Sequence, residues 1–161
     1  MSATIIQGHR ALKVLPSNDA EIPFPAIAQS GVNTSVVASQ LVDTAATFVT
    51  NSVRTGDIVY NITDSTAATV VSVTNQNQLT MNADIFTATA KSYIIYVNSS
   101  QQTIGNQGCV LYIGGPGNIT VTTNGSDTIT LVGLNGGQFV PVQCVKVFAT
   151  GTTATNIIAL W

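Results

Sequence analysis

The stretch Ile119-Thr-Val-Thr-Thr-Asn-Gly-Ser-Asp-Thr-Ile-Thr-Leu-Val132 decides the fold class of this chain. In two runs, β-branched and apolar residues alternate with threonine, and between them lies Asn124-Gly125, a dipeptide typical of tight hairpin turns. Residues 119–123 and 128–132 are therefore predicted to be neighbouring antiparallel strands joined by a two-residue turn. Similar short β-type runs lie before and after this hairpin, so the pattern predicts an all-β protein.

Residues 107–161 are predicted to form a β-sandwich or jelly-roll-like module. Besides the hairpin, strands are expected over 109–113, 139–149 and 155–161, with the glycine-rich stretches at 114–117 and 135–137 as turns. The strand over 139–148 alternates apolar residues on both faces and is expected to be buried on both. The candidate residues for the module core or a subunit contact are Phe139, Val147, Phe148 and Trp161.

Residues 41–98 are predicted to form a second, smaller module, a β-barrel or meander. Strands are expected over 58–60, 68–73, 79–81 and 93–97, because β-branched residues recur there between polar turns. A short helix is expected over 83–86, with Asn82 as its N-cap. The polar stretch 99–106 is the predicted linker between the two modules.

Residues 1–40 are predicted to form an extended N-terminal arm. Ile22-Pro-Phe-Pro25 excludes a helix and disfavours a central strand, because proline lacks the backbone donor and restricts the preceding residue. Ile22, Phe24 and Ile27 are unfavourable in water unless they lie against another surface. That surface is either the chain's own domain or a partner, and the sequence leaves both alternatives open.

The composition excludes several classes of function. The chain has 161 residues, of which 45% are hydrophobic but only 7% charged, where about 25% is usual. Its net charge of −2 offers no basic surface for phosphates, so no nucleic-acid partner is expected. The longest apolar runs, 93–97 and 157–161, are far shorter than a bilayer requires, and no secretory signal is recognised, so no membrane association is expected.

The residues that usually carry chemistry are few and dispersed. His9 is the single histidine and lies in the predicted arm, so no catalytic triad and no metal site are expected. Asp57 and Asp64 are the one pair of acids near each other in the β-rich middle; turn residues are the favoured interpretation, and paired glycosidase carboxylates the alternative. The stretch 114–117 lacks the Lys-Ser/Thr and the helix of a phosphate-binding loop. No catalytic residue and no cofactor are therefore predicted.

Cys109 and Cys144 lie in separate predicted strands. Two cysteines in neighbouring strands can pair across a sheet, and the sequence leaves this alternative open. Free buried thiols, which pack as small apolar side chains, are the favoured interpretation in the absence of a secretory signal.

Two stretches carry a resemblance to a known class of protein. The ending Gly137-Gln-Phe-Val-Pro-Val-Gln-Cys-Val-Lys-Val-Phe-Ala-Thr-Gly-Thr-Thr-Ala-Thr-Asn-Ile-Ile-Ala-Leu-Trp161 resembles that of small virion proteins, which include head-spike base and capsid decoration proteins. The stretch Phe48-Val-Thr-Asn-Ser-Val-Arg-Thr-Gly-Asp-Ile-Val-Tyr-Asn61 and the β-runs after it resemble a module of marine phage structural proteins. The chain thus resembles structural proteins of tailed bacteriophages.

This resemblance implies a capsid decoration, or cement, protein on the exterior of the virion. Such a protein binds the outer surface of the major capsid protein shell as a homo-oligomer, with a homotrimer as the usual arrangement. The arm residues expected to contact the capsid are Ile22, Phe24, Pro25 and Ile27. The alternatives are a head-spike base, for which pentameric positions are usual, a tail or fibre component that binds the host, and, third, a depolymerase that uses Asp57 and Asp64.

Overall fold

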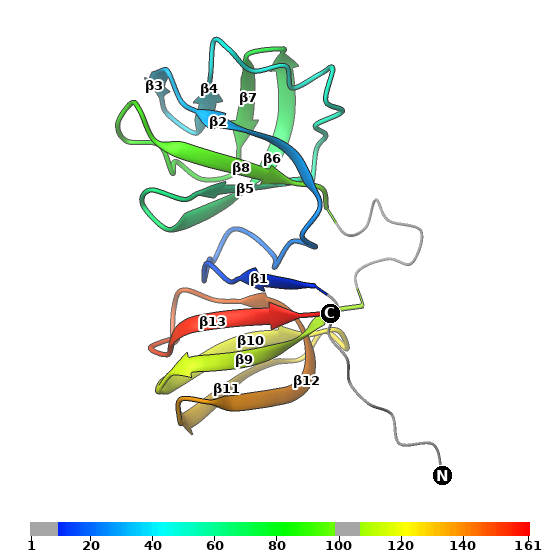
Figure 1. Ribbon diagram of the computed structural model, residues 1–161, viewed down its shortest axis with the longest axis vertical. Coiled ribbons are helices and arrows are strands. Elements are labelled where there is room, and N and C mark those ends of the chain that lie inside the picture. The colour runs from blue at the N-terminus through cyan, green and yellow to red at the C-terminus, as the bar shows by residue number, and fades with distance from the viewer. Residues whose placement is uncertain (1–9, 99–106) are drawn as a thin grey trace.

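The computed structural model describes residues 10–98 and 107–161, which consist of β-strands and loops without a helix. The strands form two antiparallel sheets, one of seven strands and one of six. Figure 1 shows the seven-stranded sheet above the six-stranded sheet. The all-β fold class is confirmed, and neither sheet closes into a barrel. The predicted linker over 99–106 and His9 lie outside the described residues.

The seven-stranded sheet has the order β2-β8-β5-β6-β7-β4-β3. Its strands are β2 (Ile27–Val32), β3 (Ser35–Val37), β4 (Gln40–Val42), β5 (Ile58–Asn61), β6 (Thr66–Asn75), β7 (Gln78–Met81) and β8 (Ser92–Tyr96). The predicted runs at 58–60, 68–73, 79–81 and 93–97 correspond to β5, β6, β7 and β8. The consecutive strands β5, β6 and β7 form a meander, and β8 pairs with β5 on its other side. β2 adds beside β8, and β4 and β3 add beside β7.

The ten-residue strand β6 curves the seven-stranded sheet around a core. Its first part pairs with β5 and its second part, from Val70, pairs with β7, with register shifts along the second part. Within the curve lie buried side chains that include Phe48, Leu79 and Phe86. A strand that changes partner midway turns one sheet into two facing layers, so both layers share the same apolar core.

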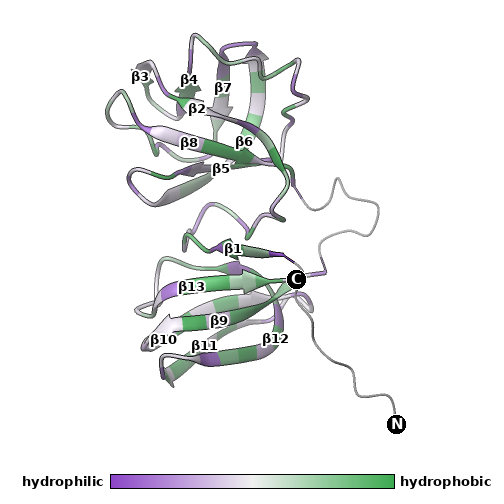
Figure 2. Cartoon of the chain, in the orientation of Figure 1, coloured by the Kyte–Doolittle hydropathy of each residue, from purple (hydrophilic) through white to green (hydrophobic). Residues whose placement is uncertain are grey.

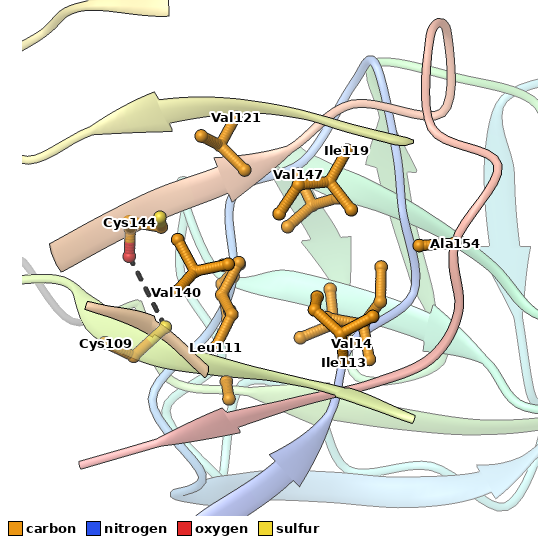
Figure 3. Close-up of a cluster of buried hydrophobic side chains, with 13 residues drawn as sticks. Val14, Cys109, Leu111, Ile113, Ile119, Val121, Val140, Cys144, Val147 and Ala154 are labelled. Carbon is orange, nitrogen blue, oxygen red and sulfur yellow. Dashed lines mark hydrogen bonds between the residues drawn. The ribbon is translucent and has the colours of Figure 1, made fainter. Parts of the chain in front are cut away.

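The six-stranded sheet has the order β1-β13-β9-β12-β10-β11. Its strands are β1 (Ala11–Lys13), β9 (Cys109–Gly115), β10 (Gly117–Thr123), β11 (Thr128–Leu134), β12 (Gln138–Val147) and β13 (Thr155–Leu160). Here the ten-residue β12 changes partner, because it pairs with β9 up to Cys144 and with β10 from there on. Figure 3 shows the buried side chains that gather within this curve, among them Leu111, Ile113 and Val140.

Residues 14–22, which we call the bridging segment, lie between the two sheets (Figure 1). Val14 and Ile22 belong to the core of the six-stranded sheet. Leu15 and Ala20 belong instead to a separate cluster with Tyr60 and other residues of β5, β6 and β8. As a result β5 is buried along its whole length, one face toward its own core and the other toward the bridging segment.

Hydrogen bonds attach the bridging segment to both sheets. The N–H groups of Ser17 and Ile22 donate to the carbonyls of Val147 and Val145 in β12, both at 2.9 Å. On the other side the Ser17 hydroxyl donates to the Ala67 carbonyl in β6 at 2.8 Å. The Asp19 carbonyl accepts a further bond from the Thr69 hydroxyl in β6 at 2.8 Å. One residue, Ser17, is thus bonded to both sheets.

These contacts correct the prediction of an extended arm over residues 1–40. In the described part of that range, β1 pairs with β13, β2 pairs with β8, and β3 and β4 extend the seven-stranded sheet. A strand of three residues, such as β1, β3 or β4, is too short for its alternation to be recognised, and β1 pairs with β13, which is far away in the sequence. The Pro-rich stretch 22–25 lies outside the strands, as its prolines require.

Two local predictions are also corrected. β10 and β11 form the predicted hairpin, but the loop spans residues 124–127, and Ser126 rather than Gly125 has the positive φ, at 71°. The helix expected over 83–86 is absent. The Asn82 side chain does not cap a helix; it accepts from the Thr69 N–H at 2.9 Å and donates to the Asp19 carbonyl at 2.7 Å. Long-range partners outweighed the local helix signal.

The bridging segment yields a test of stability with a matched control. Replacing Ile22, which is 4% exposed, by alanine should lower the free energy of unfolding by about 2–5 kcal/mol, because it leaves a cavity in the core. Ile27, five residues further on and 60% exposed, should lose no more than about 0.5 kcal/mol in the same substitution. Urea unfolding measures both. Equal losses in the two variants would contradict the assignment of Ile22 to the core.

Candidate functional site

Ile22, the first of the predicted capsid-contact residues, is not available for contact. Its side chain is 4% exposed and packs in the core of the six-stranded sheet. Its N–H is bonded to the Val145 carbonyl. The prediction that Ile22 anchors a partner is therefore wrong, since the surface that covers it is the chain's own domain, which was one of the two alternatives.

Phe24 and Pro25 lie half-buried where β1 meets the C-terminal residue. The Phe24 ring meets the Trp161 ring edge-on, with centroids 5.6 Å apart. The Arg10 guanidinium lies over the Phe24 ring, 5.1 Å from its centroid, and donates to the Pro25 carbonyl at 3.0 Å. These contacts hold Phe24 on its own domain while part of its ring stays accessible.

Ile27 is the predicted contact residue that the structure leaves exposed. It begins β2, which forms one edge of the seven-stranded sheet, and 60% of its surface is accessible. Beside it lies a hollow of about 360 Å³, which we call the β2 groove. Its lining comes from β2, from the loop before β5 and from the end of β8: Ile27, Ala28, Asn51, Ser52, Arg54, Asp57 and Val97.

The side chains around the β2 groove are fixed by hydrogen bonds from neighbouring loops. Asp57 is 1% exposed, and its carboxylate accepts from the N–H groups of Arg54 at 2.8 Å and Asn98 at 2.9 Å. The Asn51 amide donates to the Gln29 side chain and to the Thr47 hydroxyl. The groove therefore combines apolar Ile27 and Val97 with amide and hydroxyl groups, a surface suited to an extended polypeptide.

The sequence pointed to Ile27 but not to the other residues of the groove. Asn51, Arg54 and Val97 come from two segments that are far apart in the sequence and meet beside β2 through folding alone. Among them only the Gly56-Asp57 turn carried a local signal, and that signal was for a turn. No local sequence pattern therefore predicts this groove.

The predicted core or subunit-contact residues divide between the interior and the surface. Val147 is buried in the core of the six-stranded sheet, and Phe148 is half-buried beneath the Lys146 ammonium, 4.7 Å from its centroid. Phe139 is 58% exposed and packs against Tyr112 of β9, with centroids 5.3 Å apart. Trp161 is partly buried and packs against the same core as Val147, so Phe139 is the most exposed member of this set.

The exposure of Phe139 corrects the expectation that residues 139–148 are buried on both faces. The register shifts between Val140 and Cys144, so the strict alternation breaks. Within β12 the buried side chains are those of Val140, Cys144 and Val147. Figure 2 shows that hydrophobic and hydrophilic residues are mixed along the strands of both sheets.

Asp57 and Asp64 each have a separate local role. Asp57 is buried and bonded to two backbone N–H groups, as described above. Asp64 pairs with the Lys91 ammonium at 2.9 Å and accepts from the Asn61 amide at 2.9 Å. These bonds hold the pKa of the Asp64 carboxyl below its ordinary value. Both acids thus have the turn-stabilising contacts that the sequence favoured for them.

Cys109 and Cys144 face each other across β9 and β12 as free, buried thiols. The Cys109 thiol donates to the Cys144 carbonyl at 3.4 Å, the dashed line in Figure 3. Burial, and to a lesser extent the neighbouring Cys144, raises the pKa of Cys109 to about 12. Burial likewise raises the pKa of Cys144 to about 11. The favoured prediction of free buried thiols is confirmed.

The described residues form neither a metal-binding cluster nor a membrane-spanning helix. Across residues 10–98 and 107–161, no three His, Cys, Asp or Glu side chains come close enough together to hold a metal ion. In the described part of the chain there is also no helix long and apolar enough to cross a membrane.

The glycine-rich stretch at 114–117 contains the end of β9, the start of β10 and the tight connection between them.

The fold and these surfaces define an all-β protein of two antiparallel sheets that share a bridging segment, with apolar side chains exposed at Ile27 and Phe139. Comparisons with protein-family models, with curated proteins and with solved structures found no match.

The two thiols yield a prediction about pH. The folded protein keeps both thiols protonated to a higher pH than the unfolded chain does, since both pKa values are raised from 9.0. Above about pH 9 the unfolded state loses protons that the folded state retains, so the free energy of unfolding should fall as pH rises. The slope should approach about 1.4 kcal/mol per pH unit for each thiol.

Urea unfolding of the reduced protein from pH 7 to pH 10 measures this slope. The double variant Cys109→Ala/Cys144→Ala should be less stable at pH 7 but should lose less stability toward pH 10. Equal slopes for the variant and the unchanged protein would contradict the raised thiol pKa values.

Proposed function

We propose that this protein is a non-enzymatic structural protein of a tailed-phage virion, a capsid decoration protein that binds the outer surface of the major capsid protein shell and stabilises it. The proposal joins the sequence resemblance to the surface described above. The observation that carries it is the exposed Ile27 at the start of edge strand β2, beside the β2 groove.

An exposed sheet edge beside a groove of mixed apolar and polar lining suits an extended protein segment. Within the described chain, β2 pairs with β8 on one side, and no strand pairs with its other side. A segment of a neighbouring protein can add to such an edge through backbone hydrogen bonds and place a side chain in the groove. In this proposal the segment belongs to the major capsid protein.

The neutral surface supports the same proposal. Few charges have to be desolvated when surfaces covered with hydroxyl and amide groups meet, whereas the burial of unpaired charges costs far more free energy. Stabilisation of a shell then comes from several copies of the same contact within one oligomer. In a homotrimer, the binding of one β2 edge brings the other two to their sites at a high effective concentration.

Binding to shells tests the role of β2. Ile27→Asp places a charge at the proposed contact and should weaken binding to capsid shells assembled without this protein by at least tenfold. Val36→Asp is the matched control: Val36 is 47% exposed in β3, at the opposite edge of the same sheet, and its substitution should leave binding unchanged. Co-sedimentation with shells measures both. Equal binding by the two variants would contradict the assignment of β2.

The oligomeric state tests the role of Phe139. Light scattering of the purified protein should give the mass of a trimer, and Phe139→Ser should lower that mass toward the monomer, because it removes an aromatic side chain that is 58% exposed. Circular dichroism should show that the variant stays folded. A pentamer, or a trimer that neither binds shells nor raises their melting temperature, would favour the head-spike base or tail component over the decoration protein.

A further inference from the structure

β11 forms one edge of the six-stranded sheet, and no strand of the described chain pairs with its outer side. With seven residues it is longer than the other edge strands, β1, β2 and β3. It contains no charged residue, and Ile129 and Val132 are 49% and 74% exposed. A long apolar edge without charges is a site at which a strand of another chain can add. β11 is therefore a candidate for association.

The backbone groups of alternate β11 residues point away from the sheet. Thr130 lies directly opposite Thr120 of β10. The Thr120 N–H donates to the Thr152 hydroxyl at 3.0 Å, and its carbonyl accepts from the Phe148 N–H at 2.9 Å, so neither group points toward β11. In an antiparallel ladder both residues of such a pair turn their backbone groups outward. The N–H and carbonyl of Thr130, and those of the residues two positions before and after it, therefore face the open side of the sheet.

Two copies of β11 complement each other under a two-fold axis at Thr130. Antiparallel pairing centred there places Thr130 opposite Thr130 of the second copy. It also places Thr128 of each copy opposite Val132 of the other. These are the residues whose backbone groups face outward, so each such pair can exchange two hydrogen bonds.

The side chains agree with this pairing on both faces of the sheet. Ile129 lies opposite the buried Val121 and so faces the core, yet it stays half-exposed because the sheet ends there. The pairing places Ile129 of each copy opposite Leu131 of the other, which packs against the same core. On the outer face, the hydroxyls of Thr120 and Thr130 are 2.8 Å apart, and their row continues into the second copy. The apolar and the hydroxyl-bearing face are therefore both extended.

A register shifted by one residue fits less well. Pairing centred on Leu131 would place Ile129 opposite Gly133, which has no side chain to cover it. Pairing centred on Ile129 would place the Asp127 carboxylate opposite the apolar side chain of Leu131, which disfavours the charge. The pairing centred on Thr130 is therefore favoured.

We propose that β11 pairs with β11 of a second copy of this chain, antiparallel and centred on Thr130, so that two six-stranded sheets become one continuous sheet. The same strand serves both copies, as a two-fold contact requires. The contact uses neither β2 nor Phe139, so it does not depend on the proposed function. One strand per copy is a small contact beside the roughly 1,200–2,000 Å² of a stable interface, so the pairing should be weak and concentration-dependent.

Disulfide trapping tests the register. Oxidation of the full-length Thr130→Cys variant with copper phenanthroline should link two chains, because the Cα atoms of such a pair are about 5.5 Å apart, within the range of a disulfide. Val132→Cys is the matched control. Its position is 74% exposed, but four residues of strand, or about 13 Å, separate its two copies, so at least tenfold less linked product should form. Cys109 and Cys144 are buried, so the unchanged protein should give none. Non-reducing electrophoresis measures the yields. Equal yields from the two variants, or none from either, would overturn the proposal.

Sedimentation velocity tests the association itself. The average mass of the unchanged protein should rise with concentration. Thr130→Glu places two like charges directly opposite each other and should weaken this association at least tenfold. Ser35→Glu adds the same charge to an exposed position in β3, an edge strand of the other sheet, and should leave the association unchanged. A mass that does not rise with concentration, or that rises equally in both variants, would overturn the proposal.

Discussion

The attachment of the bridging segment to both sheets is the constraint on which the rest of the structure depends. Each small sheet can bury only a limited apolar area by itself. Each sheet would also leave apolar side chains exposed on the face that the bridging segment covers. The bridging segment covers both faces at once, with Ile22 in one core and Leu15 against the other sheet. Ser17 provides polar bonds in both directions. Loss of this segment would expose β5 on one face.

Both sheets enclose their apolar core in the same way. β6 and β12 are each ten residues long, and each changes its hydrogen-bonding partner midway. The sheet thereby folds over its own apolar face without a helix to cover it. Close packing also leaves little space beside the edge strand β2. A Cβ at Gly31 would come 2.5 Å from the carboxylate of Asp43, which accepts the buried hydrogen bond of Tyr93.

Local sequence signals predicted the strands with a clear run of β-branched and apolar residues, and missed the three-residue strands β1, β3 and β4 and the edge strand β2. β10 and β11 alternate clearly and pair with each other, so the hairpin was predictable. β1 pairs with β13 near the other end of the chain, and no local pattern in three residues reveals that. The candidate site divides in the same way. Apolar residues beside prolines pointed to Ile22 and Ile27 together, but contact with β12 decided that Ile22 is buried and Ile27 is not.

The same long-range contacts determine which surfaces remain for binding. The bridging segment is held between the sheets, so Ile22, just before Pro23, is buried and stabilises the fold. Ile27, two residues after Pro25, begins the edge strand β2. An exposed edge strand carries a risk of unwanted association, which proteins commonly reduce with charged side chains. β2 has no charged residue, and its first residue is a largely exposed isoleucine. The edge strands β3 and β11 also lack charged residues and expose apolar side chains, so the contact that we propose at β2 rests on the groove beside Ile27 and not on the edge alone.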